Sequence, residues 1–167
     1  SRSNHLGGVL IDGAAGNIVG GSGLPPLNWI SSNRGPGVLV QGAAATANRI
    51  EGNFIGTNFT GDAPMGNEGA GVEVVEASDV QIVGNLISGN ESHGVSISCQ
   101  DDTFDHDNRV QGNYIGTPAD GSAVLGMGNW RDGVRITCRG NRVGGSDAGQ
   151  DNVIAGNFGA GIQIDRD

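Results

Sequence analysis

Short stretches in which apolar and polar residues alternate recur along the whole chain, each directly after a glycine. In the stretch NESHGVSISC, residues 90–99, Val95 and Ile97 alternate with Ser96, as on a β-strand with one buried face. An asparagine precedes each such glycine by four positions, in the pairs Asn4–Gly8, Asn33–Gly37, Asn67–Gly71, Asn90–Gly94, Asn129–Gly133 and Asn157–Gly161. The glycines are 29, 34, 23, 39 and 28 residues apart. A repeat of this size with variable spacing indicates a solenoid whose insertions lie in the turns.

Two further strand-like columns follow the first one in each repeat. The second column contains NIVGG, NRIEGN, VQIVGN, NRVQGN and NRVGG, and the third contains NWISSN, NFIGT, NLISGN, NYIGT and NVIAGN. The chain shows no helical periodicity. Three short strands per repeat, stacked about 4.8 Å apart, predict an all-β parallel β-helix solenoid of about five rungs. We expect residues 1–167 to form a single domain of this kind.

The alternation assigns the inward-facing residues to four ladders. The first column supplies two of them: Val9, Val38, Val72, Val95, Val134 and Ile162; and Ile11, Val40, Val74, Ile97, Ile136 and Ile164. The second and third columns supply Val19, Ile50, Ile82, Val110 and Val143; and Ile30, Ile55, Ile87, Ile115 and Ile154. Corner asparagines should stack as well, because a buried amide can bond to the rungs above and below; these are Asn28, Asn53, Asn85, Asn113 and Asn152.

The alternation of NxIxGNxIGT with NxISGNxxxGVxI resembles the right-handed parallel β-helix repeats of bacterial surface and secreted polypeptides. The resemblance covers essentially the whole chain and implies a right-handed solenoid that is secreted or displayed at the cell surface. The resemblance does not indicate one function, because lyases, hydrolases, adhesins and inert stalks all have this fold. The chain starts in the last turn of one rung and stops after the first strand of another, without a capping helix. We therefore expect a segment of a longer protein, or one whose ends a partner covers.

Charge and hydropathy exclude two classes of partner. The formal net charge of −9 argues against nucleic acid and against anionic membrane surfaces. No apolar run is long enough to span a bilayer. We expect neither a nucleic-acid partner nor a membrane partner.

The two cysteines occupy the same position on neighbouring rungs. Cys99 and Cys138 each lie five residues after the glycine of their strand, so their Cα atoms should be about 5 Å apart, which a disulfide permits. A pair of buried free thiols fits the position too, and we favour it slightly because stacked parallel positions give imperfect disulfide dihedrals. No other cysteine joins the pair, so the sequence gives no reason to expect a metal site there.

Candidate chemistry lies on the outward face of the first column. Insertions at residues 57–67, 98–107 and 117–129 lie on both sides of this column and should wall a groove along it. The residues that face this groove on consecutive rungs are the candidate catalytic residues Glu73, His93, Asp132 and Arg135, and the candidate substrate-binding residues Ser96, Trp130 and Arg131. Arginine can bind a uronate carboxylate with two hydrogen bonds, and tryptophan offers a stacking face to a sugar ring. The candidate ligand is therefore a polysaccharide.

A second resemblance is local. The segments SHGVSI and GVRIT, residues 92–97 and 133–137, resemble the histidine and arginine motifs of the polygalacturonases, pectin hydrolases with the same fold. This implies a hydrolase with His93 and Arg135 in its active site. Those enzymes carry paired aspartates on the preceding rung, where this chain has EGAGVEV with Ala70 at the position of the acid. The aspartate pair of QDDT, residues 100–103, comes after His93. Glu73 and Asp132 are two rungs apart, too far for the spacing of about 6.5–9.5 Å that inverting hydrolysis requires.

A polysaccharide lyase would combine a basic side chain with Ca²⁺ held by carboxylates. The acidic segment DDTFDHD is the candidate calcium site, through Asp101, Asp102, Asp105 and Asp107. Its spacing is not that of an EF-hand loop, and a solvated acidic loop is the simpler interpretation. We expect no cofactor to be required, with calcium as the candidate metal.

An apolar stripe runs along the outward side of the third column, formed by Trp29, Phe54, Leu86, Tyr114 and Val153. Either the loops after Thr57 and Thr117 fold over it, which we favour, or a second copy of the chain covers it. We expect a non-catalytic extracellular module, either a structural stalk or a carbohydrate-contacting section of a surface or secreted protein. The alternatives are a polysaccharide-degrading enzyme of the pectinase or lyase type, and a self-association module that forms homo-oligomers through the open ends or through the stripe.

Overall fold

The computed structural model describes residues 3–23, 28–100, 105–122 and 126–165. These residues form sixteen strands in three parallel sheets, and no helix. The first sheet contains β1 (Val9–Asp12), β4 (Val38–Gln41), β7 (Val72–Val75), β10 (Val95–Ser98), β13 (Val134–Ile136) and β16 (Ile162–Ile164). The second contains β2 (Ile18–Gly20), β5 (Arg49–Glu51), β8 (Gln81–Val83), β11 (Arg109–Gln111) and β14 (Arg142–Val143). The third contains β3 (Trp29–Ile30), β6 (Phe54–Ile55), β9 (Leu86–Ile87), β12 (Tyr114–Ile115) and β15 (Val153–Ile154).

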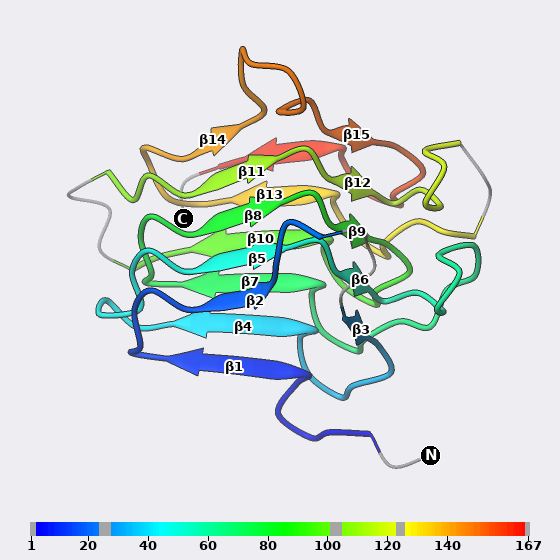
Figure 1. Ribbon diagram of the computed structural model, residues 1–167, viewed down its shortest axis with the longest axis horizontal. Helices are drawn as coiled ribbons and strands as arrows, with labels where there is room; N and C mark the ends of the chain where they lie inside the picture. The colour runs from blue at the N-terminus through cyan, green and yellow to red at the C-terminus, as the bar shows by residue number, and fades with distance from the viewer. Residues whose placement is uncertain (1–2, 24–27, 101–104, 123–125, 166–167) are drawn as a thin grey trace.

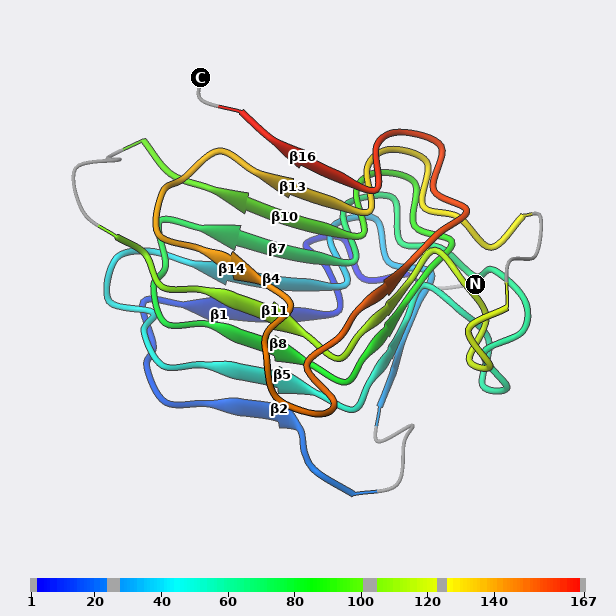
Figure 2. The ribbon, with the colours of Figure 1, turned by 90° about the horizontal axis from the view of Figure 1, so that it is seen from above.

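Each rung contributes one strand to each sheet. Strand order within every sheet follows chain order in steps of three, so five rungs are complete and β16 starts the next one. Figures 1 and 2 show the rungs stacked from the blue first strand to the red last one. The prediction of an all-β parallel solenoid of five rungs with three strands each is confirmed.

The interior consists of the four ladders that the alternation predicted. Val95, for example, pairs with Val72 of β7 and with Val134 of β13, and Ile97 pairs with Val74 and Ile136. The inner residues of the central rungs are fully buried, and they form one continuous core. The ladders are in register because a strand that slipped by one residue would turn its whole apolar set to solvent.

Asparagine ladders run along all three corners, although the sequence analysis predicted only one. In the predicted ladder, Asn85 Nδ2 donates to Asn113 Oδ1 at 3.1 Å and to the Ile50 carbonyl at 2.8 Å. The asparagines that precede the first column form a second ladder: Asn4, Asn33, Asn67, Asn90, Asn129 and Asn157. The third corner holds Asn17, Asn48, Asn108 and Asn141, with Val80 in one place of the column. Most of these amides also bond to backbone carbonyls of the neighbouring rung that would otherwise be buried without a partner.

The glycine before every first-column strand except the last is explained by close packing against the next rung rather than by an unusual backbone angle. A Cβ atom on Gly94 would lie 2.6 Å from the Gly133 carbonyl oxygen and 2.7 Å from Ile115 Cγ2. Equivalent conflicts exist at Gly37, Gly71 and Gly133. The turn therefore packs against the next rung without room for a side chain, which explains why glycine recurs while its neighbours vary.

The apolar stripe on the third sheet is covered by loops at its centre, as we favoured. Phe54 and Leu86 are 9% and 2% exposed. A Cβ on Gly61 would lie 2.8 Å from Phe54 Cε2 and 2.8 Å from Leu86 Cδ2, so the loop that contains Gly61 packs on both side chains. The loop that follows Thr117 joins this cover, because the Ala119 amide donates to the Gly61 carbonyl at 3.0 Å. Trp29 and Tyr114 stay exposed at 58% and 38%. The proposed homo-oligomer face is therefore smaller than the sequence indicated, since two of its five members, Phe54 and Leu86, lie under loops.

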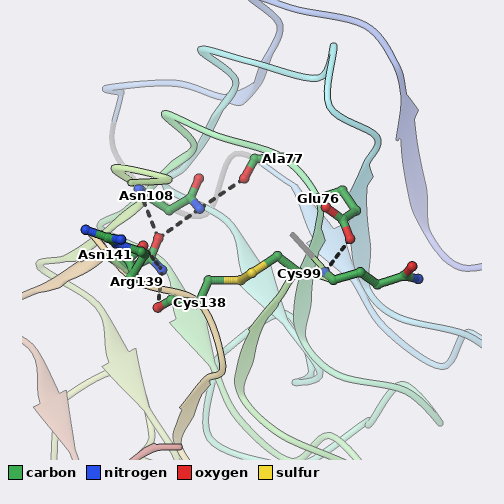
Figure 3. Close-up of a disulfide and its surroundings, with 8 residues drawn as sticks. Glu76, Ala77, Cys99, Asn108, Cys138, Arg139 and Asn141 are labelled. Carbon is green, nitrogen blue, oxygen red and sulfur yellow. Dashed lines mark hydrogen bonds between the residues drawn. A yellow bond between two sulfur atoms is a disulfide. The ribbon is translucent and has the colours of Figure 1, made fainter. Parts of the chain in front are cut away.

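Cys99 and Cys138 form a disulfide, with Cα atoms 5.7 Å apart (Figure 3). The expectation of free thiols is wrong. Ile97 and Ile136 are the last residues that β10 and β13 pair with each other, and the cysteines lie two residues beyond them, so the pairing of these two strands does not reach the cysteines. Their Cα separation lies inside the usual range for disulfides.

Candidate functional site

A polar groove of about 310 Å³ lies over the outward side of β7 and β10. It is lined by Glu68, Gly69, Ala70, Glu73, Glu91, Ser92, His93, Ser96 and Arg131. Four of these, Glu73, His93, Ser96 and Arg131, are predicted site residues, so the groove expected beside this column exists. Three carboxylates, one imidazole and one guanidinium face a single concave surface.

A second groove adjoins the first and has a different character. It measures about 390 Å³ and is lined by Pro64, Gly66, Gly89, Glu91, Gly126, Trp130 and Phe158. Glu91 belongs to both grooves. Trp130 and Phe158 are 63% and 74% exposed, so both present open aromatic faces at its edge. The two grooves together offer polar groups beside a stacking platform.

Both grooves are lined in part by the residues that directly follow the first-column asparagines. Glu68, Glu91, Trp130 and Phe158 hold this position on consecutive rungs, where the Glu91 amide donates to the Asn67 carbonyl and the Trp130 amide to the Asn90 carbonyl, both at 2.9 Å. Sequence reasoning included Trp130 but missed Glu68 and Glu91. The signal that identifies both is their shared position, directly after a repeat asparagine.

His93 and Asp132 lie on neighbouring rungs and contact each other, as predicted. The Asp132 backbone N–H donates to His93 Nδ1 at 3.3 Å, and Asp132 Oδ2 lies 3.2 Å from the same ring nitrogen. The other oxygen of Asp132 accepts a hydrogen bond from the Ala160 amide at 2.8 Å. Both side chains are largely buried. Asp132 therefore orients the imidazole, and Nδ1 is the ring nitrogen that faces it.

Burial lowers the pKa of His93 below its usual value of 6.5, and Arg131 and Arg135 lower it further, whereas the Asp132 carboxylate raises it. His93 is therefore neutral at pH 7. As the pH falls through about 6.5, the unfolded chain takes up this proton first, so acidification lowers the stability of the folded protein.

We expect Asp132→Asn to lower the pKa of His93 below its wild-type value, because the substitution removes the charge that raises it. Titration of the histidine ring signals by NMR measures both values, with His93→Asn to assign the signal. A wild-type pKa above 6.5, or an unchanged pKa in Asp132→Asn, would contradict this account of the pair.

Glu73, Ser96 and Arg135 form the predicted cross-strand row, since Ser96 pairs with Glu73 on one side and with Arg135 on the other. Burial raises the pKa of Glu73. Arg135 Nη2 lies 3.6 Å from Asp165 Oδ2, toward the next rung, and Arg135 does not line the polar groove. Arg131 lines it instead. The structure thus brings together Glu73, His93, Ser96 and Arg131, and turns Arg135 away from them.

Glu73 and Asp132 do not face one groove as the two carboxyl groups of a glycoside hydrolase do, because Glu73 lines the polar groove and Asp132 does not. They are separated by two strand spacings and by three positions along the strand, which places their Cα atoms roughly 14 Å apart. The Asp132 carboxylate is also occupied by His93 and the Ala160 amide.

The candidate calcium site lies partly outside the described residues, which include neither Asp101 nor Asp102. Asp105 Oδ1 pairs with Arg139 Nε at 2.9 Å, and Asp107 is exposed. One of the two visible carboxylates is therefore already paired with a cation. Calcium binding at this loop stays a prediction.

Comparison with known proteins identifies the fold family. The family model described as right handed beta helix region matches residues 2–167 of the chain. No curated protein and no solved structure matches it. Within the described residues, no helix has the length and apolar character needed to cross a membrane. The family match agrees with the handedness that the repeat resemblance implied.

Proposed function

Because this chain belongs to the right-handed β-helix family, whose fold supports binding modules as well as enzymes, we propose from its grooves that it is a non-catalytic carbohydrate-binding module. The observation that carries the proposal is the polar groove that adjoins an aromatic one through Glu91. Sugars present hydroxyl groups along their edges and C–H groups on their faces. A row of carboxylates beside an exposed indole matches both surfaces.

The charge of the polar groove favours a neutral glycan over a uronate. Glu68, Glu73 and Glu91 outnumber Arg131, and His93 is neutral at pH 7. A polyanion would meet a negative local field in addition to the net charge of −9 of the whole chain. Carboxylates accept hydrogen bonds from sugar hydroxyls instead, and such charge-assisted bonds are strong. Arg135, the residue expected to bind a uronate carboxylate, faces Asp165.

An extracellular location belongs to the same proposal. The Cys99–Cys138 disulfide supports it, because disulfides persist mainly in oxidising compartments. A polysaccharide ligand is available there to a surface or secreted protein.

We expect Trp130→Ala to weaken binding to a neutral polysaccharide about fivefold to tenfold, since stacking on one exposed indole is worth roughly 1–1.4 kcal/mol. Trp29→Ala is the matched control, because Trp29 is exposed to a similar degree but lies on the third sheet. Isothermal titration with glucan, mannan and xylan fragments, and with polygalacturonate, measures both variants. Tighter binding of polygalacturonate, or equal losses in the two variants, would contradict the proposal.

A second candidate function is a polysaccharide-degrading enzyme, and the His93–Asp132 pair is the observation that favours it. A neutral histidine oriented by a carboxylate is a suitable general base. Reducing ends and unsaturated uronate absorbance, followed in the same titrations with and without Ca²⁺, separate the two functions. Product that forms with wild-type protein and is lost in His93→Ala would establish the enzyme and displace the binding module.

A further inference from the structure

Three residues with metal-binding side chains meet at the turn between the first and second sheets. The ligand atoms of Cys99, Cys138 and His106 all lie within 4.8 Å of one another. Cys138 and His106 are buried, with His106 only 1% exposed, and Cys99 is half-buried. Histidine was not expected here, because the sequence analysis sought a further cysteine and placed His106 in an acidic loop.

The backbone on neighbouring rungs fixes the position of His106. Its amide donates to the Arg139 carbonyl at 3.3 Å, and its carbonyl accepts from the Asp79 amide at 2.8 Å. The adjacent Asp105 pairs with the Arg139 side chain. On the other side, Asn141 Nδ2 donates to the Cys138 carbonyl at 2.9 Å (Figure 3). The turn is therefore held at His106 and at Cys138 by bonds that do not involve the disulfide.

We propose that the reduced form of this cluster binds one Zn²⁺ ion through the thiolates of Cys99 and Cys138 and the imidazole of His106. Zinc prefers this combination of sulfur and nitrogen ligands in tetrahedral geometry. Three protein ligands leave the fourth position to water. The cluster then has two alternative states: an oxidised state closed by the disulfide, and a reduced state closed by the metal.

The conversion requires a reductant, which a dithiol supplies. The dithiol is oxidised to its cyclic disulfide, the sulfur–sulfur bond between Cys99 and Cys138 breaks, and each cysteine gains a proton and an electron. Zn²⁺ then displaces the two thiol protons, so binding releases protons and depends on pH. In a tetrahedral site the two sulfur atoms would lie about 3.8 Å apart. Rotation of the two side chains provides this separation at a Cα distance of 5.7 Å.

The test uses the full chain, reduced with dithiothreitol, freed of it under nitrogen, and titrated with Zn²⁺ and with Co²⁺. We expect one equivalent to bind the reduced protein, with the Co²⁺ form showing thiolate charge-transfer and tetrahedral d–d absorption. The oxidised protein should bind at least about 100-fold more weakly. His106→Ala removes a direct ligand and should also weaken binding at least about 100-fold. Substituting a residue that only supports a metal ligand already lowers metal affinity by up to about 100-fold. His5→Ala is the control, because His5 is exposed and lies on the first rung.

Several results would overturn the proposal. One is absence of binding by reduced protein whose circular dichroism still shows the β-sheet. Another is equal affinity in His106→Ala and His5→Ala. Where reduction or substitution unfolds the chain, failure of Zn²⁺ to restore the β-sheet signal of the reduced wild type counts against it. Equal zinc binding by Cys99→Ser would do the same, because that variant lacks one proposed thiolate.

Discussion

Replacing Asn85 by alanine lowers the free energy of unfolding by about 3–5 kcal/mol, we expect, because several buried polar groups lose their partners together. The Asn85 amide nitrogen donates to the Ile50 carbonyl at 2.8 Å and to Asn113 Oδ1 at 3.1 Å. Its oxygen accepts from the Asn53 backbone nitrogen at 3.0 Å and from Asn53 Nδ2 at 3.1 Å. Each unsatisfied buried group costs about 1–3 kcal/mol.

Asn28→Ala is the matched control, since Asn28 stands at the end of the same ladder and is exposed. Its side chain donates to Asn53 Oδ1 at 2.8 Å, and water can replace that bond. We expect Asn28→Ala to lower the free energy of unfolding by less than about 1 kcal/mol. Urea unfolding followed by circular dichroism measures both variants. Similar losses in the two variants would mean that the ladder contributes through individual bonds rather than through burial.

Gly94→Ala should lower the free energy of unfolding by about 3 kcal/mol, the upper part of the range for overpacked cores. The added methyl would lie 2.6 Å from the Gly133 carbonyl oxygen and 2.9 Å from Asn129 Nδ2. Relief of these contacts requires the turn to move away from the next rung, which also weakens the bond from the Gly94 amide to the Asp132 carbonyl, 3.0 Å long. The substitution therefore disturbs the rung that carries His93.

Gly161→Ala tests the cause directly. Gly161 holds the same column position, but a Cβ there would meet only Ile154 Cγ2, at the ordinary contact distance of 3.7 Å. We expect a change within about 0.5 kcal/mol, as for substitutions away from packed features. Thermal unfolding of both variants decides the matter. If Gly161→Ala also lost several kcal/mol of stability, the turn itself would require glycine, and contact with the next rung would not be the cause.

The local pattern was enough to predict which residues stack on which. Strand side chains alternate with a period of two, and a repeated Asn-xxx-Gly fixes the phase of each strand, so aligning the repeats also aligns the rungs. The four ladders, the third-sheet asparagine corner and the contact between His93 and Asp132 all follow from this alignment. Glu68 and Glu91 follow from it too, but only if the position after each asparagine is included.

Features that depend on insertions or on long side chains required the tertiary structure. His106 follows an insertion that occurs after the first column on one rung only, so aligning the repeats could not bring it to Cys99 and Cys138. Arg131 and Arg135 are four residues apart, yet one lines the groove and the other turns to Asp165, because neighbouring charges and space decide the direction of a long side chain. Repetition in the sequence determined the rungs and their register, because each rung repeats the packing of the last. The adjoining aromatic groove, the disulfide and the candidate metal site were decided only in three dimensions, because they depend on contacts that occur once.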